Sequence, residues 1–352
     1  MLNFDLLTLN NHQILNKLVL SENNIVNLPR NLLKKLQFLR NLDLSGNIIE
    51  KIYTTMFIDL NSLENLNLSK NSLKTFDDSL LEVLPALLSL NLSYNHIDSI
   101  EHLMNNTITK INTLDLSHNN ISSLPKGFSA SLLNLQYLDL SFNKIHSVED
   151  CNLMHLHSLK AIYINNNFII TLNMLALPKT LIELHSGYNQ ISEISYNLIH
   201  IEILNLQHNN ISALHANLIT NNLQYLNISG NLLSDFPNVI SENLKVLDIS
   251  NNKFTYVPKV ISIKNFPLLF QLDVSENSIE NLTINSDLKL NLFVANKMNM
   301  LKNIEKDTLS NLRPPSNDCI NLTISNNKML TFIHEYALRH MNLCSVSYKI
   351  LL

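Results

Sequence analysis

One arrangement of apolar and polar positions recurs along most of the 352-residue chain. Its clearest copy spans residues 135–148, L-Q-Y-L-D-L-S-F-N-K-I-H-S-V, where Leu135, Leu138 and Leu140 stand eight, five and three residues before Asn143. Leu138 and Leu140 follow the period of two that is expected of a short strand with one buried face. The apolar residues after Asn143 return the chain beneath that strand. The pattern therefore predicts a stack of short strands that needs no closed core.

An asparagine ends each copy of the pattern, at the point where the chain leaves the strand. Its side-chain amide can donate two hydrogen bonds and accept two, so it can satisfy turn backbone groups that would otherwise cost about 1–3 kcal/mol each when buried. We interpret fourteen asparagines as one structural ladder: Asn23, Asn47, Asn71, Asn95, Asn119, Asn143, Asn167, Asn189, Asn209, Asn231, Asn252, Asn277, Asn296 and Asn327. The first six intervals are 24 residues each, and the later ones are 22, 20, 22, 21, 25, 19 and 31. Repeat thirteen departs most from the pattern, because Asn291 stands where a leucine belongs.

The frame L-x-x-L-x-L-x-x-N-x-L is the signature of leucine-rich repeats. The 24-residue spacing with "LSxN" after the strand resembles the typical class of animal extracellular leucine-rich repeat proteins. The mixture of regular and shorter units resembles first the chaoptin-like adhesion proteins of insects and second the ectodomains of Toll-like receptors, over about Leu15 to Tyr348. This resemblance implies a protein that is displayed at the cell surface and binds protein partners.

The predicted fold class is an α/β solenoid: a leucine-rich repeat horseshoe with a parallel inner β-sheet of about 14 short strands. Its convex side is expected to be irregular or to carry short helices.

The repeats divide this single elongated domain into four segments. Residues 1–14 are an incomplete N-terminal edge or the remnant of a preceding repeat, and residues 15–301 contain repeats one to thirteen. Residues 302–318 are expected to form an irregular loop or an insertion, and residues 319–352 contain repeat fourteen and a truncated repeat fifteen. Because both ends would expose an unpaired strand edge, we expect the chain to be a fragment of a longer protein.

Composition excludes several classes of function. Only four glycines occur, so no Gly-rich phosphate loop or dinucleotide fingerprint can be assembled. His334, Glu335 and His340 miss the H-E-x-x-H spacing of zinc peptidases. We therefore predict no enzyme activity, no catalytic residue, no cofactor, no metal site and no small-molecule substrate.

The sequence gives no signal of its own for a membrane. The N-terminus lacks the basic leader of a secretory signal, and no apolar run approaches the roughly 20 residues that cross a bilayer. Contact with a membrane is expected only through flanking segments that this chain lacks.

The three cysteines, Cys151, Cys319 and Cys344, cannot all pair with one another. Cys319 takes the place of the first leucine of repeat fourteen, so we expect a small buried apolar side chain there. Cys344 lies one frame position away in the next repeat, and this proximity also allows a bridge.

Eight N-x-S/T sequons would suit a secreted glycoprotein: Asn67, Asn91, Asn105, Asn120, Asn210, Asn227, Asn281 and Asn321. The repeat template itself generates "NLS" and "NIS" in an asparagine-rich chain, so most of these matches carry little information. Asn105, which lies away from any predicted strand, is the best candidate for glycosylation.

The outward side chains of the predicted sheet fall six, four, two and one positions before each ladder asparagine. Aspartates recur four positions before it, at 43, 115, 139, 248 and 273, which makes this face repel phosphates and excludes nucleic acid as a partner. Aromatic and histidine side chains gather on the same face in repeats four to ten and are our candidates for ligand binding: Tyr94, His118, Tyr137, Phe142, Tyr163, His185, Tyr188, His208 and Tyr225. Tyr and Phe are enriched at the centres of protein interfaces, although Tyr137 and Tyr225 both belong to "LQYL" and could simply pack along the sheet.

Two functions follow from these observations. The first is a non-catalytic module of an extracellular or cell-surface adhesion or receptor protein, which binds a protein ligand or a homophilic partner on the concave sheet. The alternative is a cytoplasmic leucine-rich repeat scaffold or a regulatory subunit of an enzyme, which three unpaired cysteines would favour.

Overall fold

The computed structural model describes residues 12–29, 32–101, 109–125, 127–151, 153–195, 200–315, 318–339 and 341–348. The chain divides into two units, Met1–Leu181 and Ile182–Leu352. They are called the N-terminal unit and the C-terminal unit, and each is described by itself.

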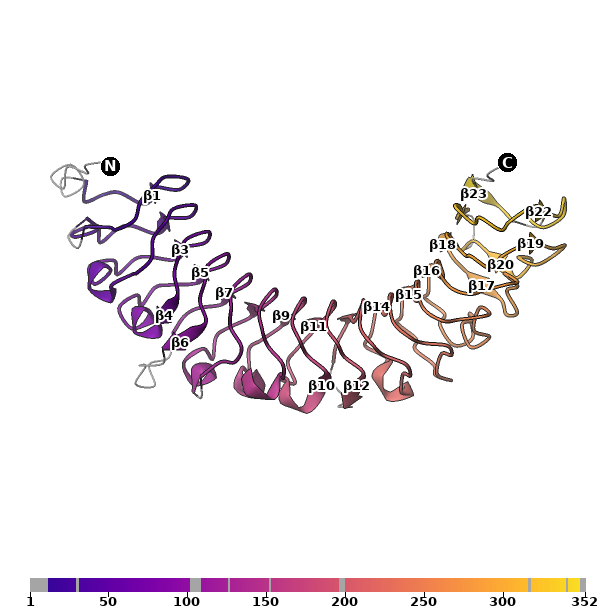
Figure 1. The fold of residues 1–352 in the computed structure, drawn as a ribbon, viewed down its shortest axis with the longest axis horizontal. Coiled ribbons are helices and arrows are strands. Elements are labelled where there is room, and N and C mark those ends of the chain that lie inside the picture. Colours follow the sequence, from indigo (N-terminus) through magenta and orange to yellow (C-terminus); the bar gives the residue numbers. More distant parts are fainter. Residues whose placement is uncertain are drawn as a thin grey trace. The chain divides into compact units, whose positions relative to one another are not determined.

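The N-terminal unit is built on seven three-residue strands that pair in parallel, one from each repeat (Figure 1). In order of pairing they are β1 (Lys17–Val19), β2 (Asn41–Asp43), β3 (Asn65–Asn67), β5 (Ser89–Asn91), β7 (Thr113–Asp115), β8 (Tyr137–Asp139) and β9 (Ala161–Tyr163). The register advances by one repeat at each step, so that Leu114 of β7 lies beside Leu138 of β8.

The C-terminal unit continues the same construction with eight strands (Figure 1). They are β11 (Glu183–His185), β13 (Ile203–Asn205), β14 (Tyr225–Asn227), β15 (Val246–Asp248), β16 (Gln271–Asp273), β18 (Leu292–Val294), β21 (Ile320–Ile324) and β23 (Leu343–Tyr348). The fifteen strands that the described residues form in the two units confirm a parallel-sheet solenoid, and β23 is the strand of repeat fifteen.

The core lies on one side of the strands because their middle residue points inward. Leu138, in the middle of β8, and Leu140, which follows the strand, are fully buried, whereas Tyr137 and Asp139 face outward and keep access to solvent. A buried leucine side chain contributes roughly 1.5–3 kcal/mol when it leaves water completely. Most of this gain requires a neighbouring repeat to cover the side chain, so the repeats stabilise one another.

The backs of the repeats hold short 3-10 helices instead of α-helices. In the described residues these are η1 (Thr54–Met56), η2 (Asp78–Leu81), η3 (Phe128–Ser131), η4 (Glu149–Cys151), η5 (Leu153–His155), η6 (Met174–Ala176) and η7 (Ala216–Leu218). Asp77 and Asn173 cap η2 and η6 by accepting a hydrogen bond from a backbone N–H. No helix among the described residues has the length and apolar character needed to cross a membrane.

Further short strands lie on the backs. Three parallel pairs form within a unit: β4 (Thr75–Asp77) with β6 (Ser99–Glu101), β17 (Leu288–Lys289) with β20 (Leu312–Arg313), and β19 (Asn303–Ile304) with β22 (Phe332–Ile333). The remaining two are β10 (Thr171–Asn173) and β12 (Glu193–Ser195).

Two of these back strands lie within residues 302–318, where the sequence predicted an irregular loop or an insertion. Over 302–315 the chain forms β19 and β20 and buries Ile304, Leu309 and Leu312. This stretch is therefore an ordered return arm of repeat thirteen and not an irregular loop.

Ladder asparagines bind backbone groups of two successive repeats. The side-chain nitrogen of Asn71 donates to the carbonyl oxygens of Leu68, in its own repeat, and Leu44, in the preceding one, at 3.0 Å each. Its side-chain oxygen accepts from the backbone N–H of Ile49 at 3.0 Å. The same bond to the carbonyl of the preceding repeat is made by Asn47, Asn95, Asn119, Asn143, Asn167, Asn209, Asn231, Asn252, Asn277 and Asn327.

Two of the fourteen residues differ from this pattern, whereas the bonds of Asn189 to Ser186 and Gly187 of its own turn follow it. Asn23 is exposed, and within the described residues its side chain bonds to Leu20 and Ser21 of its own turn. The assignment of Asn296 is wrong by two residues.

The ladder position of repeat thirteen is held by Met298. It follows the third residue of β18 by four positions, as Asn277 follows β16, and its side chain is fully buried. The frame of this repeat is then intact, because Leu290, Phe293 and Ala295 occupy the three apolar positions and are buried. Asn296 instead accepts hydrogen bonds from Ser325 of the next repeat.

Candidate protein-binding surface

Each repeat presents two kinds of outward position near the ladder. The first and third strand residues form the open sheet face. The residue just before the ladder position adopts a left-handed backbone conformation, as in Tyr94, His118 and Phe142 with φ of 53°, 52° and 55°. We call this second set the left-handed row.

Three side chains of the left-handed row stack into a column in the N-terminal unit. The rings of Tyr94 and His118 lie 3.9 Å apart with an 11° angle between their planes, and those of His118 and Phe142 lie 4.0 Å apart with 12°. Their repeats follow one another at the spacing of paired strands, about 4.8 Å, which brings equivalent rings face to face. Tyr94 and Phe142 remain 50% and 45% exposed. Tyr94, His118 and Phe142 are called the aromatic column.

Two carboxylates lie beside this column on the open sheet face. Asp115 of β7 and Asp139 of β8 occupy neighbouring places in the register. The Oδ1 atom of each accepts the backbone N–H two residues on, from Ser117 at 3.0 Å and from Ser141 at 2.8 Å. Burial raises the pKa of Asp139, the Ser141 hydrogen bonds lower it, and the nearby charge of Asp115 raises it further, with a net increase.

Two tyrosines complete the surface. Tyr137, the first residue of β8, is 45% exposed, and Tyr163, the third residue of β9, is half-buried and lies beside Asp139 in the register. The acidic–aromatic surface is defined as the aromatic column together with Asp115, Tyr137, Asp139 and Tyr163. The structure therefore brings five of the nine ligand-binding candidates together on one unit.

The other four candidates lie in the C-terminal unit. Tyr188 and His208 of the left-handed row stack with ring centroids 4.5 Å apart. The His208 ring extends over Gly230, where an added Cβ would lie 2.5 Å from its Nδ1. Within β11 the Nε2 atom of His185 lies 3.8 Å from the Oε2 atom of Glu183. Tyr225 is a half-buried residue of β14.

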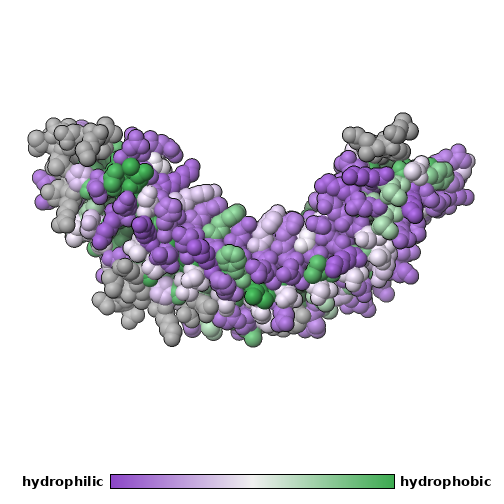
Figure 2. Space-filling model, in the orientation of Figure 1, coloured by the Kyte–Doolittle hydropathy of each residue, from purple (hydrophilic) through white to green (hydrophobic). Residues whose placement is uncertain are grey.

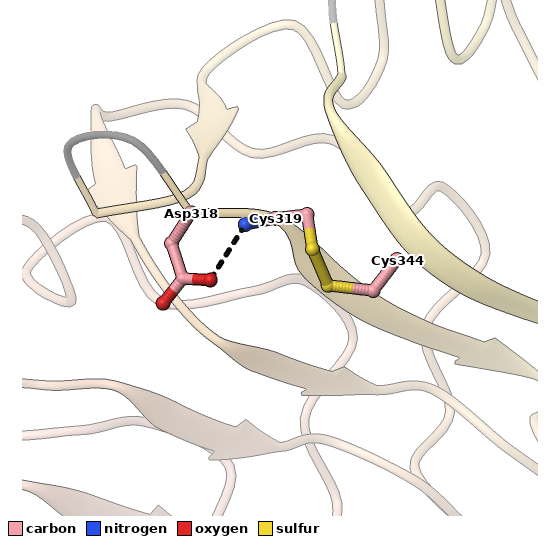
Figure 3. Close-up of side chains that lie close together, drawn as sticks. All are labelled: Asp318, Cys319 and Cys344. Atoms are coloured by element: carbon pink, nitrogen blue, oxygen red, sulfur yellow. Dashed lines mark hydrogen bonds between the residues drawn. A yellow bond between two sulfur atoms is a disulfide. The ribbon is translucent and has the colours of Figure 1, made fainter.

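A third group of side chains lies near the end of the C-terminal unit (Figure 3). Cys319 and Cys344 form a disulfide with Cα atoms 5.1 Å apart, and Asp318 lies within 4.8 Å of both sulfurs. Sulfurs that are bonded to each other offer no thiolate, so the group presents only one carboxylate to a metal ion. Asp318 has a structural role: its side chain accepts from Cys319 N and Asn291, and its carbonyl oxygen accepts from Asn342.

The disulfide corrects two sequence interpretations. Cys319 is not a fully buried apolar residue, because its side chain is half-buried and crosslinked to the strand of the next repeat. The three cysteines are also not all unpaired: among the described residues Cys151 is the one cysteine outside the disulfide, and it is buried. Asn105 falls outside the described residues.

The surface of each unit is predominantly polar on the side visible in Figure 2, and hydrophobic side chains form separate areas on it. The sequence pattern had pointed to the aromatic side chains one by one but not to their stacking. A signal for the column was present, since Tyr94, His118 and Phe142 are spaced by 24 residues, the length of one repeat.

Comparisons with known families agree with the repeat pattern. The leucine rich repeat family matches residues 13–73, 39–97 and 109–169, and a second description of the leucine rich repeat matches residues 222–242 and 243–263. No curated protein matches the sequence of this chain.

Several solved structures share the fold. The leucine-rich repeat domain of APL1 aligns with a TM-score of 0.72 at 21% identity, over 99% of this chain and 89% of that one. Toll in its complex with Spatzle, from Drosophila, aligns with a TM-score of 0.61 at 18% identity, over 84% of this chain and 45% of that one. The LRIM1/APL1C complex aligns with a TM-score of 0.58 at 18% identity, over 97% of this chain and 53% of that one. This chain thus spans about half the length of the chains in the two complexes.

Proposed function

Because this chain is a leucine-rich repeat protein, we propose that it is a non-catalytic module that binds a protein ligand on its open sheet face. The acidic–aromatic surface of the N-terminal unit carries this proposal. The module belongs to a cell-surface adhesion or receptor protein, and the ligand is a different protein or a second copy of the chain.

The aromatic column suits a protein ligand for a physical reason. Tyr and Phe rings offer a large contact area and lose little conformational entropy on binding. Stacking of Tyr94 and Phe142 against His118 already restricts both rings, so less entropy is lost when a partner covers them. Aromatic side chains surrounded by polar residues match the composition of interface centres.

Two observations support this partner class and location. The relatives of similar fold include complexes with proteins, Toll with Spatzle and LRIM1 with APL1C. The Cys319–Cys344 disulfide supports an oxidising compartment, since disulfides persist mainly in secreted and surface proteins.

The test begins with a photo-crosslinker. Benzoylphenylalanine in place of Phe142 should crosslink a protein from cell surfaces of the source organism, and the same probe in place of Phe38 serves as a control. Phe38 is 53% exposed and precedes β2, away from the left-handed row. The captured protein is then purified and its affinity is measured for the Phe142→Ala, Tyr163→Ala and Tyr188→Ala variants.

Losses of about 1–2 kcal/mol at Phe142 and Tyr163 without a change in melting temperature would support the site. Tyr188→Ala reports whether the C-terminal unit also contacts the ligand. Unchanged affinity in all three variants would reject the open sheet face and direct attention to the backs of the repeats. Light scattering of the chain alone tests the homophilic form, because self-association should weaken with Phe142→Ala.

A further inference from the structure

Building on the proposed function, we propose that the acidic–aromatic surface recognises an arginine side chain of its protein partner. The guanidinium group binds between the carboxylates of Asp115 and Asp139 and lies against the rings of Tyr137 and the aromatic column.

The negative charges of Asp115 and Asp139 are not required by the fold. In β5 the equivalent residue is Asn91, whose Oδ1 accepts the backbone N–H of Ser93 at 2.9 Å. Asp115 makes the same bond to Ser117 at 3.0 Å. A neutral asparagine therefore satisfies this turn as well as an aspartate does, and the charge is available for another role.

The two carboxylates have no lysine or arginine partner within the part of the chain that the structure describes, although the charge of His118 acts on Asp139 and lowers its pKa by a smaller amount than burial raises it. Their hydrogen bonds use only Oδ1, and the ion pairs of lysine and arginine lie elsewhere. In repeats four to seven, the outward strand residues and the two residues before the ladder include no lysine or arginine. At these outward positions the surface thus lacks the lysine or arginine counter-charge that a partner would supply.

Burial strengthens the case for a cation. Asp139 is half-buried next to a second carboxylate, and both effects raise its pKa above the ordinary value. A cation between Asp115 and Asp139 would relieve this repulsion in a place where solvent screens charges less than it does in bulk water.

The aromatic rings select arginine over lysine. A guanidinium is planar, stacks on aromatic faces and donates in a fork to carboxylate oxygens, whereas an ammonium is a compact and strongly hydrated charge. The side chains of Tyr137 and Phe142, each 45% exposed, lie on the same surface as the carboxylates. The carboxylates and the aromatic rings together therefore fit the guanidinium group of an arginine side chain from a partner protein.

The experiment uses a fluorescein-labelled peptide of four arginines alternating with glycines, and its lysine and citrulline counterparts. Fluorescence anisotropy with the full chain at pH 7.5 and 0.15 M salt measures the dissociation constant. We expect the arginine peptide to bind at least about threefold more tightly than the lysine peptide. The citrulline peptide, which keeps the shape and loses the charge, should bind at least about tenfold more weakly than the arginine peptide.

A matched pair of variants locates the site. Asp115→Asn with Asp139→Asn should weaken arginine-peptide binding about tenfold, while the melting temperature is not lowered, because Asn91 shows that asparagine fits this turn. The control is Asp248→Asn with Asp273→Asn, a second registered pair whose left-handed row holds Asn251 and Glu276 instead of aromatic rings. The control pair should change affinity less than about twofold.

Equal weakening by the two pairs, or equal binding of arginine and lysine peptides, would overturn the proposal in favour of unspecific attraction to an acidic protein. These experiments distinguish a failure of arginine recognition from a failure of the proposed binding surface. A captured partner that depends on Phe142 but not on Asp115 and Asp139 would refute arginine recognition and leave the binding surface in place.

Discussion

The side-chain nitrogen of Asn143 donates to the carbonyl oxygen of Leu116, 27 residues earlier in the chain, at 2.9 Å. In the opposite direction the side-chain oxygen of Asn143 accepts from the backbone N–H of Ile121 at 2.9 Å. One buried amide therefore fastens repeat six to repeat five at two points. The ladder supplies bonds between repeats where the strands themselves are only three residues long.

Replacement of Asn143 by alanine is predicted to lower the free energy of unfolding by about 1–3 kcal/mol, because it leaves the buried Ile121 N–H without its acceptor. It also removes one of the two side-chain hydrogen bonds that the Leu116 carbonyl accepts, while the one from Asn119 stays. Asn23→Ala is the matched control. Asn23 is exposed, and the bonds that it makes within the described residues stay in its own turn, so the loss should be smaller. Urea denaturation of both variants measures the difference, and equal losses would contradict a role in joining repeats.

Replacement of Asp139 by asparagine is predicted to stabilise the protein at neutral pH. Burial, followed by the charge of Asp115, holds the pKa of the folded carboxyl above the value of about 3.8 in the unfolded chain. The folded state then binds the proton more tightly, so the contribution of Asp139 to stability is fully present below pH 3.8 and is lost as pH rises through the folded pKa. The gain in stability from Asp139→Asn should therefore grow as pH rises from 3.8 through the folded pKa, and it should vanish below pH 3.8.

Thermal melts from pH 3.5 to 7.5 check this prediction. Asp273→Asn should also raise the melting temperature more at neutral pH than in acid, because burial raises the pKa of the Asp273 carboxyl and the charge of Asp248 raises it further. A gain that is the same at every pH would exclude the carboxyl as its source.

Replacement of Cys344 by serine is predicted to loosen the last strand. The disulfide closes a loop with a sequence separation of 25 residues, and the chain-entropy model assigns roughly 3–4 kcal/mol to a loop of this size. Amide hydrogen exchange should accelerate in β23 and stay unchanged in β8, which is in the other unit. Unaltered protection of β23 would mean that its pairing with β21 alone holds it.

Replacement of Gly230 by alanine is predicted to cost about 1 kcal/mol for the left-handed backbone, since φ is 65° there, and to displace the His208 ring as well. The displacement should break the stack with Tyr188. In a His208→Ala background only the backbone cost remains, so the two substitutions should be non-additive. Additive losses of stability would show that ring and Cβ do not collide.

The strands and their inward faces were predictable from sequence because burial enforces a strict spacing, as in Leu138 and Leu140. The frame of repeat thirteen was not predictable in this way, because Asn296 suggested a ladder position that is in fact held by Met298. The apolar residues Leu290, Phe293 and Ala295 would have identified the frame, since core packing constrains them more than it constrains the turn.

The disulfide and the aromatic column depend on distances across the sheet. Cys319 and Cys344 are each compatible with a small apolar residue, and only the register of β21 with β23 brings them within bonding distance. Tyr94, His118 and Phe142 share a frame position, but that position also holds Lys70 and Asn166. The sequence could therefore name the residues of the candidate site, whereas their stacking required the structure.

The bonds between repeats are the same from one repeat to the next over much of the N-terminal unit. Asn71 reaches Leu44 and Asn95 reaches Leu68, with identical distances of 3.0 Å. An unequal genetic exchange that duplicated one 24-residue stretch there would insert a module that finds matching neighbours on both sides. Growth of this kind leaves the interior unchanged and adds a new set of outward positions. Length can then evolve by copying, and binding specificity by later divergence of the copies.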